Sequence, residues 1–416
     1  MTKKGFPFLL AAIMLAAILA LTSLPGCSSK TNTATTTTTS ASAQPIKTYT
    51  IGLCAELTGF LGAYNTATVN EAQIAVDMVN ENGGIMVGGQ NYLLKLVVED
   101  GKSTLDGTTA AANKLIFSDN VKFILGPDAY FNSAVSGLCE QNKIMHIGGY
   151  CTMQPGELDS TTTYSFLGQG ASINYFTGVL AYLKANYPNV KKVALTMPDD
   201  GSIPYFGKAV QQMVQDAGYT VAGSIIGYDN NAVDFSPYAA KVMATQADAV
   251  IACSGVVLPN GSILKNMRDA GSNMLFVVCN SVIPSDYVKV AGTKESTGVV
   301  DCSACYIGAP DPSPILQEMI TRYIRSIGGT GALVTLEYAN PVWELAQLFN
   351  KANSFDPAVV KTTFENMSSI ETFYGTGTIS GLKTFGIKHA VSYQLPITTI
   401  DNGVPTFKQW EPALVP

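Results

Sequence analysis

Cysteine and histidine are the residues of this chain that could carry chemistry. Of the eight cysteines, Cys302 and Cys305 form a C-x-x-C pair, a spacing found in redox pairs and in half of a zinc site. The sequence offers no second C-x-x-C and no nearby histidine to complete a zinc site, so we expect no metal and no cofactor. Cys54, Cys253 and Cys279 lie in or beside apolar runs and are expected to be buried free thiols, whereas a redox role for the C-x-x-C pair stays open.

The two histidines do not suggest an active site. His146 lies in the apolar run Ile144–Ile147, which predicts a buried, hydrogen-bonded imidazole, and His389 lies near the end of the chain. A thiol–base pair of His146 with Cys139 or Cys151 is conceivable, but these residues are neighbours only along the chain. Because no G-x-S-x-G, H-E-x-x-H or P-loop pattern is present, we do not expect an enzyme.

The N-terminus has the pattern of an export signal. Lys3 and Lys4 precede an apolar run, Phe6–Leu21, and the sequence Leu24-Pro25-Gly26-Cys27 follows. This end resembles the bacterial lipobox, from which Pro25 departs; the resemblance implies that residues 1–26 are a lipoprotein signal peptide and that Cys27 is lipidated. The alternative is an uncleaved anchor, but a membrane span wants about 20 apolar residues. Either way, the working part is expected outside the cytoplasm, held at the membrane through Cys27.

Composition separates a tether from a globular part and excludes some partners. Residues 27–46 are rich in Thr and Ser and lack apolar periodicity, so they are expected to be a disordered tether. The formal charge is −6, and losing Lys3 and Lys4 with the signal would make it −8. Without a basic run, nucleic acid is not an expected partner.

The globular part alternates strand and helix patterns in two series. The first begins with the strand-like run Tyr49–Ala55 and the helical pattern Thr66–Asn80, and the second begins with the helix Ile173–Asn186 and the strand Val193–Met197. Such alternation predicts an α/β fold of two doubly wound, mostly parallel sheets, with a ligand cleft beyond the carboxyl ends of the strands.

The order of several short motifs resembles one protein family across nearly all of the mature chain. The motifs are Ile51–Phe60, Asn80–Ile85, Val98-Glu99-Asp100, Ile124-Leu125-Gly126-Pro127 and Met197-Pro198-Asp199-Asp200. With the lipoprotein signal in front, they are similar to the leucine/isoleucine/valine-binding branch of the type I periplasmic binding proteins.

This resemblance implies a solute-binding lipoprotein that delivers a small polar ligand to the permease of an ABC importer. It implies two lobes, 47–167 plus 299–375 and 168–298 plus 376–416, joined by a three-segment hinge. The three crossings are expected near Phe166–Gly168, Gly298–Asp301 and Tyr374–Gly377. A sensory receptor module with the same cleft, signalling through a partner, is the alternative.

The resemblance also places ligand contacts at the ends of strands. Asn132 and Ser133, at a helix start, are expected to receive a carboxylate, and Tyr150 and Thr152 are expected to add a carbonyl and a hydroxyl. Ordinary helix capping is the other interpretation of both loops. Further expected contacts are Tyr64 in the first lobe, with Ser202, Tyr205 and Val256 in the second; Asp199 and Asp200 are expected to serve loop structure instead.

Asn280 departs from the family pattern. Amino-acid binders of the family commonly carry a carboxylate at this place, which neutralises the ligand's ammonium group. An amide compensates a buried ammonium poorly, so the residue predicts a ligand with a carboxylate, amide or hydroxyl and no cation. Glu56 and Asp301 are possible substitutes for the missing carboxylate.

Overall fold

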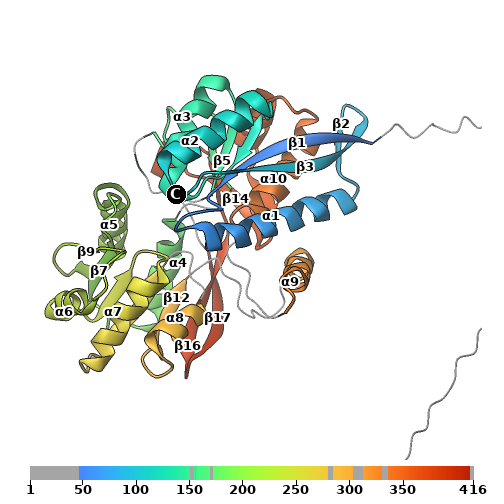
Figure 1. Ribbon diagram of the computed structural model, residues 1–416. Helices are drawn as coiled ribbons and strands as arrows, with labels where there is room; N and C mark the ends of the chain where they lie inside the picture. The colour runs from blue at the N-terminus through green and yellow to red at the C-terminus, as the bar shows by residue number, and fades with distance from the viewer. Residues whose placement is uncertain are drawn as a thin grey trace, which may run out of the picture. The chain divides into compact units, whose positions relative to one another are not determined.

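The globular part of the chain forms two sheets, each covered by helices on both faces (Figure 1). The computed structural model describes residues 46–149, 154, 156–168, 172–279, 284–302, 313–329 and 336–412. The first sheet has the strand order β13 (Ser369–Thr372), β14 (Gly375–Ser380), β15 (Ala390–Ser392), β6 (Ser165–Leu167), β5 (Met145–Gly148), β4 (Phe123–Leu125), β1 (Lys47–Ala55), β3 (Gln90–Asp100) and β2 (Ile85–Val87).

The second sheet follows the same plan. Its order is β17 (Val404–Pro412), β16 (Gln394–Asp401), β12 (Val300–Cys302), β11 (Leu275–Cys279), β10 (Ala249–Ala252), β7 (Lys192–Pro198) and β8 (Thr220–Val221), with β9 (Ile226–Tyr228) beside β7. The central strands of both sheets pair in parallel, and the antiparallel pairs lie toward the edges. The predicted fold class of two doubly wound, mostly parallel sheets is therefore confirmed.

Successive side chains of β1 face opposite sides of the first sheet, and helices cover both sides. Ile51 and Leu53 pack in one core with α1 (Gly62–Glu81) and α10 (Ala339–Ala352). Cys54 points to the opposite face, where α2 (Leu105–Asn113) and α3 (Asn132–Asn142) cover it. Because successive strand residues face opposite sides, a strand that is buried on both faces is apolar throughout.

The second sheet is covered in the same way. On β7, Leu195 packs into the core that includes α4 (Asn174–Asn186) and α5 (Lys208–Asp216), and Ala194 faces a separate core. That second core is built with α6 (Ser236–Ala244), α7 (Val257–Asp269) and α8 (Pro284–Ala291). The other helical segments are η1 (Lys114–Ser118), η2 (Ala129–Phe131), η3 (Ile203–Gly207), α9 (Pro314–Ser326), α11 (Pro357–Glu365) and α12 (Leu382–Phe385).

The chain changes from one sheet to the other three times: after β6, after β12 and after β15. The first change falls where the sequence predicts it, since β6 ends at Leu167. The third differs from the expected Tyr374–Gly377, because β14 and β15 pair with the first sheet and the chain leaves it only after Ser392. The sequence predicts a strand-rich segment over 390–398, and in the structure its two parts, β15 and the start of β16, pair in different sheets. The lobe boundaries themselves stay a prediction.

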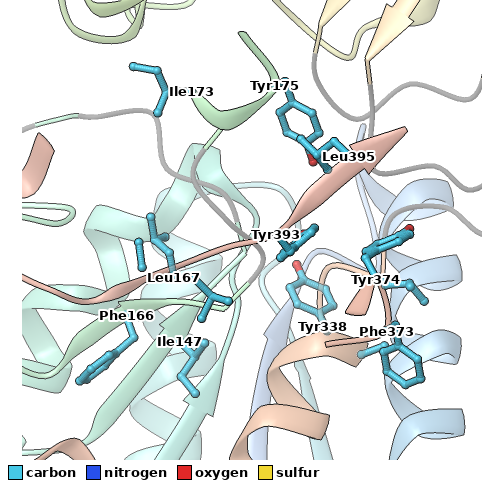
Figure 2. Close-up of a cluster of buried hydrophobic side chains, with 14 of the residues drawn as sticks. Ile147, Phe166, Leu167, Ile173, Tyr175, Tyr338, Phe373, Tyr374, Tyr393 and Leu395 are labelled. Carbon is cyan, nitrogen blue, oxygen red and sulfur yellow. The ribbon is translucent and has the colours of Figure 1, made fainter. Parts of the chain in front are cut away.

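Aromatic side chains fill the space around the third crossing (Figure 2). Tyr393 lies between β15 and β16 and stacks on Tyr374, with ring centroids 5.5 Å apart and planes 18° apart. Tyr175 of α4, Leu395 of β16 and Tyr338 belong to the same buried cluster. One apolar core therefore continues from the first sheet into the second.

Candidate functional site: a cavity lined by both halves of the fold

A cavity of about 740 Å³ is lined by loops at the carboxyl ends of strands from both sheets. This is the edge at which open parallel sheets bind ligands, and the volume is in the range of small-molecule sites, roughly 300–1,000 Å³. From the first half of the fold come Phe60, Leu61, Tyr64, Asp128, Ala129 and Tyr130. From the second come Ser172, Met197, Pro198, Asp200, Ser202, Phe206, Asn230, Asn231, Cys253 to Pro259 and Asp286.

The wall from the first half is set by the ends of β1 and β4. Phe60 and Tyr64 follow β1, and Tyr130 follows β4. The rings of Phe60 and Tyr130 are in edge contact, with their centroids 6.1 Å apart. Gly126 ends β4 with φ +71°, and a Cβ there would lie 2.1 Å from the Cys54 carbonyl oxygen. Only glycine lets β4 end this close to β1, and the turn then directs Asp128 toward the cavity.

A closed ring of hydrogen bonds holds the wall from the second half. The Tyr228 hydroxyl donates to Asn260 Oδ1 at 2.9 Å, and Asn260 Nδ2 donates to Ser254 Oγ at 3.1 Å. Ser254 Oγ and the Tyr228 hydroxyl lie 2.7 Å apart and complete the ring. All three residues are buried. This ring fixes the loop after β10, on which Ser254 and Val256 line the cavity.

Acidic groups collect behind the wall from the first half. The hydroxyl of Tyr64 donates to Glu337 Oε2 at 3.0 Å, and the Asp128 N–H donates to Glu56 Oε2 at 3.2 Å. Glu337 is fully buried, and its Oε1 accepts no hydrogen bond from the described part of the chain. A Cβ on Gly149 would lie 1.9 Å from that oxygen, so Glu337 packs directly against the end of β5.

Burial changes the acidity of this group. It raises the pKa of Glu56 to about 8 and the pKa of Asp128 to about 6. Burial also raises the pKa of Glu337 well above its ordinary value, and the nearby Asp128 adds to this shift. Taking a carboxylate out of water favours its neutral form unless a cation compensates the charge. These carboxyls are therefore held in a site that disfavours their ionised state.

Three of the predicted contact residues, Tyr64, Ser202 and Val256, line the cavity. Ser202 is buried and bonds to Asp200 Oδ1 through both its backbone N–H, at 3.0 Å, and its hydroxyl, at 2.6 Å. Asp200 therefore has the structural role expected of it and also lines the cavity. Binding by these residues stays a prediction.

The other predicted contacts lie elsewhere or outside the described residues. Asn132 is buried and donates to Glu157 Oε1 at 2.8 Å, Ser133 is exposed, and Tyr205 is 41% exposed; none of the three lines the cavity. At the start of α3, the side chain of Asn132 is buried and that of Ser133 is exposed. A residue's position in the chain therefore does not determine whether its side chain reaches the cavity. The predictions for Tyr150, Thr152, Asn280 and Cys27 lie outside the described residues.

Asp128, Tyr130 and Glu337 are not among the contact residues that the sequence predicts. Asp128 and Tyr130 come just after the Gly126-Pro127 motif at a strand end. The strand-end position that predicts Asn132 and Ser133 as contacts applies to these two residues as well. Glu337 falls in a segment that looks like the start of an apolar helix, and no local pattern marks it. Glu56, a proposed substitute for the carboxylate at position 280, is buried behind Asp128 and does not line the cavity.

The histidines and the described cysteines have structural roles. His146 is buried, with its ring nitrogens 2.7 Å from the Gly126 carbonyl and 3.3 Å from Ser165 Oγ, as predicted. Burial lowers its pKa to about 4. The described cysteines are free and buried, as expected for Cys54, Cys253 and Cys279. Among the described residues, no cluster of three His, Cys, Asp or Glu side chains could hold a metal, and Cys305 lies outside them.

Comparison with known proteins agrees with this architecture. The periplasmic binding protein family matches residues 48–403. The Leu/Ile/Val-binding protein BraC3 of Rhizobium johnstonii is 26% identical, covering 61% of this chain and 67% of the relative. Leu/Ile/Val-binding protein homolog 3 of Brucella melitensis is 24% identical, covering 80% and 87%. A solved structure of the branched-chain amino acid transporter substrate binding protein LivJ from Streptococcus pneumoniae, in complex with isoleucine, has a TM-score of 0.71 at 19% identity, covering 88% of this chain and 99% of LivJ.

The chain belongs to the periplasmic binding protein family, and the expected resemblance to the type I leucine/isoleucine/valine-binding branch is confirmed. Members of this family bind ligands without catalysing a reaction and work outside the cytoplasm, which agrees with the prediction of a non-enzyme. Among the helices that the structure describes, none has the length and apolarity needed to cross a membrane.

Proposed function

We propose that this protein is the solute-binding lipoprotein of an ABC importer, capturing a small polar ligand in the cavity and delivering it to a permease. The observation that carries the proposal is the cavity itself, because both halves of the fold line it and the chain crosses between them three times. A ligand that contacts both walls favours the conformation in which they are close, so binding shifts the protein toward a closed form.

The relatives support the same role. BraC3 and the Brucella protein are named as Leu/Ile/Val-binding proteins, and LivJ is a transporter substrate binding protein solved with isoleucine. Lipid anchoring rests on the lipobox-like sequence Leu24-Pro25-Gly26-Cys27. A mature chain that begins at Cys27 and carries the mass of a diacylglycerol would support the anchor, and a chain that keeps residues 1–26 would contradict it.

A thermal-shift and scattering experiment tests the binding role. The full chain, purified in mild detergent, is screened against amino acids, carboxylates, amides, amines and polyols, and native mass spectrometry identifies any solute that co-purifies. We expect one class of solute to raise Tm and to reduce the radius of gyration, because closure expels water from the cavity.

A pair of variants ties the effect to the cavity. Val256→Trp places a large ring in the cavity and should abolish the shift, whereas Val233→Trp, at a fully exposed valine of the same half, should keep it. The absence of any shift together with the absence of any co-purified solute would refute the proposal. An equal shift in both variants would move the site away from this cavity.

A further inference from the structure

The charged side chains that line the cavity are all acids: Asp128, Asp200 and Asp286. Asp286 has a partner outside the lining, Lys289, whose Nζ lies 2.6 Å from its Oδ1. The stretches between residues 46 and 412 that the structure does not describe contain no lysine, arginine or histidine. They therefore have no basic side chain to add to the cavity.

On the wall from the first half, the Tyr64 oxygen and the Asp128 carboxyl are hydrogen-bond acceptors. The Tyr64 hydroxyl donates its proton to Glu337 Oε2, so toward any other neighbour its oxygen can only accept a hydrogen bond. Asp128 is buried to 6% exposure and adds a carboxylate beside it. The rings of Phe60 and Tyr130 also line the cavity and are in edge contact with each other, and an aromatic face attracts a cation. Carboxylate, hydroxyl oxygen and aromatic rings together complement a protonated nitrogen.

The place expected to receive a ligand carboxylate is filled from within the protein. Asn132 Nδ2 donates to Glu157 Oε1 at 2.8 Å, and the backbone N–H of Gln154 donates to Glu157 Oε2 at 3.0 Å. Glu157 is buried, so this carboxylate is a fixed part of the structure. A second carboxylate, from a ligand, would meet a site that already holds one and would be repelled.

We propose that the cavity binds an organic amine, a solute with a protonated nitrogen and no carboxylate. The nitrogen faces Asp128 and Tyr64, and the apolar remainder of the solute lies against Phe60, Met197 and Val257. This inference rests on the proposed solute-binding function and narrows its ligand class. It replaces the expectation, drawn from Asn280, of a ligand without a cation.

The electrostatics of the site agree with this assignment. Asp128 and Glu337 are buried without a basic partner among the described residues, and burial raises the pKa of both. A protonated amine supplies the missing positive charge, and a hydrogen bond to a charged group is stronger than one between neutral groups. An anionic solute would instead place a negative charge beside two acids whose site already disfavours ionisation.

Matched sets of three compounds test the ligand class. Leucine, isoamylamine and isocaproate share one carbon skeleton, and phenylalanine, phenethylamine and hydrocinnamate share another; within each set only the charged groups differ. The full chain in mild detergent is titrated with each compound by thermal shift and by calorimetry. We expect the amine of at least one set to bind roughly tenfold or more tightly than its amino acid, and the acid to bind least.

Two variants test where the protonated nitrogen of the ligand binds. Asp128→Asn keeps the side-chain oxygen that accepts from the Tyr130 N–H but loses the charge, and it should weaken amine binding by roughly tenfold to a hundredfold. Glu344→Gln is the matched control. Like Asp128, Glu344 is a buried carboxyl. It lies on α10, its Oε1 accepts no hydrogen bond from the described residues, and it does not line the cavity. This variant should bind the amine as the wild type does.

Each other outcome overturns the inference. Tighter binding of an amino acid or an acid than of its amine would refute the ligand class while leaving the solute-binding function intact. Amine binding that Asp128→Asn does not change would refute the position of the nitrogen. If none of the compounds binds, the inference is also refuted. That result would count against the proposed function only if, in addition, no solute co-purifies with the protein.

Discussion

At the scale of single residues, two buried acids have raised pKa values, which link the stability of the fold to pH. Burial raises the pKa of Glu56 from 4.5 to about 8 and that of Asp128 from 3.8 to about 6. The folded protein thus holds these protons more tightly than the unfolded chain does. This tighter proton binding stabilises the fold fully at pH values below the unfolded pKa of each acid. The stabilisation is lost as the pH rises through the folded pKa values, about 6 for Asp128 and about 8 for Glu56.

The hydrogen bonds of Glu56 agree with a protonated carboxyl. The Thr108 hydroxyl lies 2.8 Å from the Thr104 carbonyl, to which it donates, and 3.3 Å from Glu56 Oε1. Since the hydroxyl has only one proton, a proton on Glu56 Oε1 would complete the second contact. A glutamine can make the same two contacts, with its Oε1 accepting from the Asp128 N–H and its NH₂ group donating to Thr108.

We therefore predict that Glu56→Gln flattens the pH dependence of stability. Between pH 5.5 and 8.5 the wild type should lose stability, whereas the variant should lose on the order of 2 kcal/mol less, a difference of several degrees in Tm. Thermal unfolding followed by circular dichroism at a series of pH values measures this. Glu318→Gln, at an exposed carboxyl of α9, should follow the wild-type curve. Parallel curves for wild type and Glu56→Gln would contradict the prediction.

At the scale of elements, local signals fix the starts of several helices. Asp356 precedes Pro357, and the sequence predicts a helix over Asp356–Glu365; in the structure α11 runs from Pro357 to Glu365 with Asp356 as its N-cap. Its Oδ1 accepts from the N–H groups of Ala358 at 2.8 Å and Val359 at 3.3 Å. Other elements differ. The helical pattern of residues 107–117 is divided between α2 and a π-helical turn, η1. In the apolar stretch 219–225 only Thr220–Val221 form a strand, β8, and β9 begins at Ile226.

The cap of α11 gives a prediction at this scale. Asp356→Ala removes the acceptor for two backbone N–H groups and should cost about 1 kcal/mol of unfolding free energy. Asp356→Asn keeps an acceptor oxygen and should retain most of the stability. Urea denaturation measures both values, with an unchanged slope expected because the surface exposed on unfolding is the same. Equal losses in the two variants would show that charge, and not the cap, is responsible.

At the scale of the whole molecule, the chain crosses three times between two sheets that share one apolar core. Tyr393 is the one residue between β15 and β16, and it is 4% exposed in the aromatic cluster of Figure 2. Its ring stacks on Tyr374, which leads into β14. Because the same core continues into both sheets, a cavity at this point weakens the connection between them.

Tyr393→Ala should accordingly lower stability and cooperativity together. The loss of a buried aromatic ring costs roughly 3–5 kcal/mol, and the calorimetric transition should broaden or split as the halves unfold separately. Tyr393→Phe keeps the stacked ring and should unfold in one transition close to that of the wild type. A single sharp transition in Tyr393→Ala would show that the halves are coupled by other contacts.

Sequence patterns predict the alternation of strands and helices and the two doubly wound sheets. The family resemblance adds the strand ends at which Tyr64, Ser202 and Val256 line a cavity. The alternation is predictable because a strand or helix buries its apolar side chains in a pattern set by its own geometry. The position of the third crossing and the cluster of Glu56, Asp128 and Glu337 follow only from the tertiary structure. Tyr64 and Glu337 are 273 residues apart in the chain. Their contact, and the sheet that β14 and β15 join, depend on how whole elements pack against one another, which no local pattern encodes.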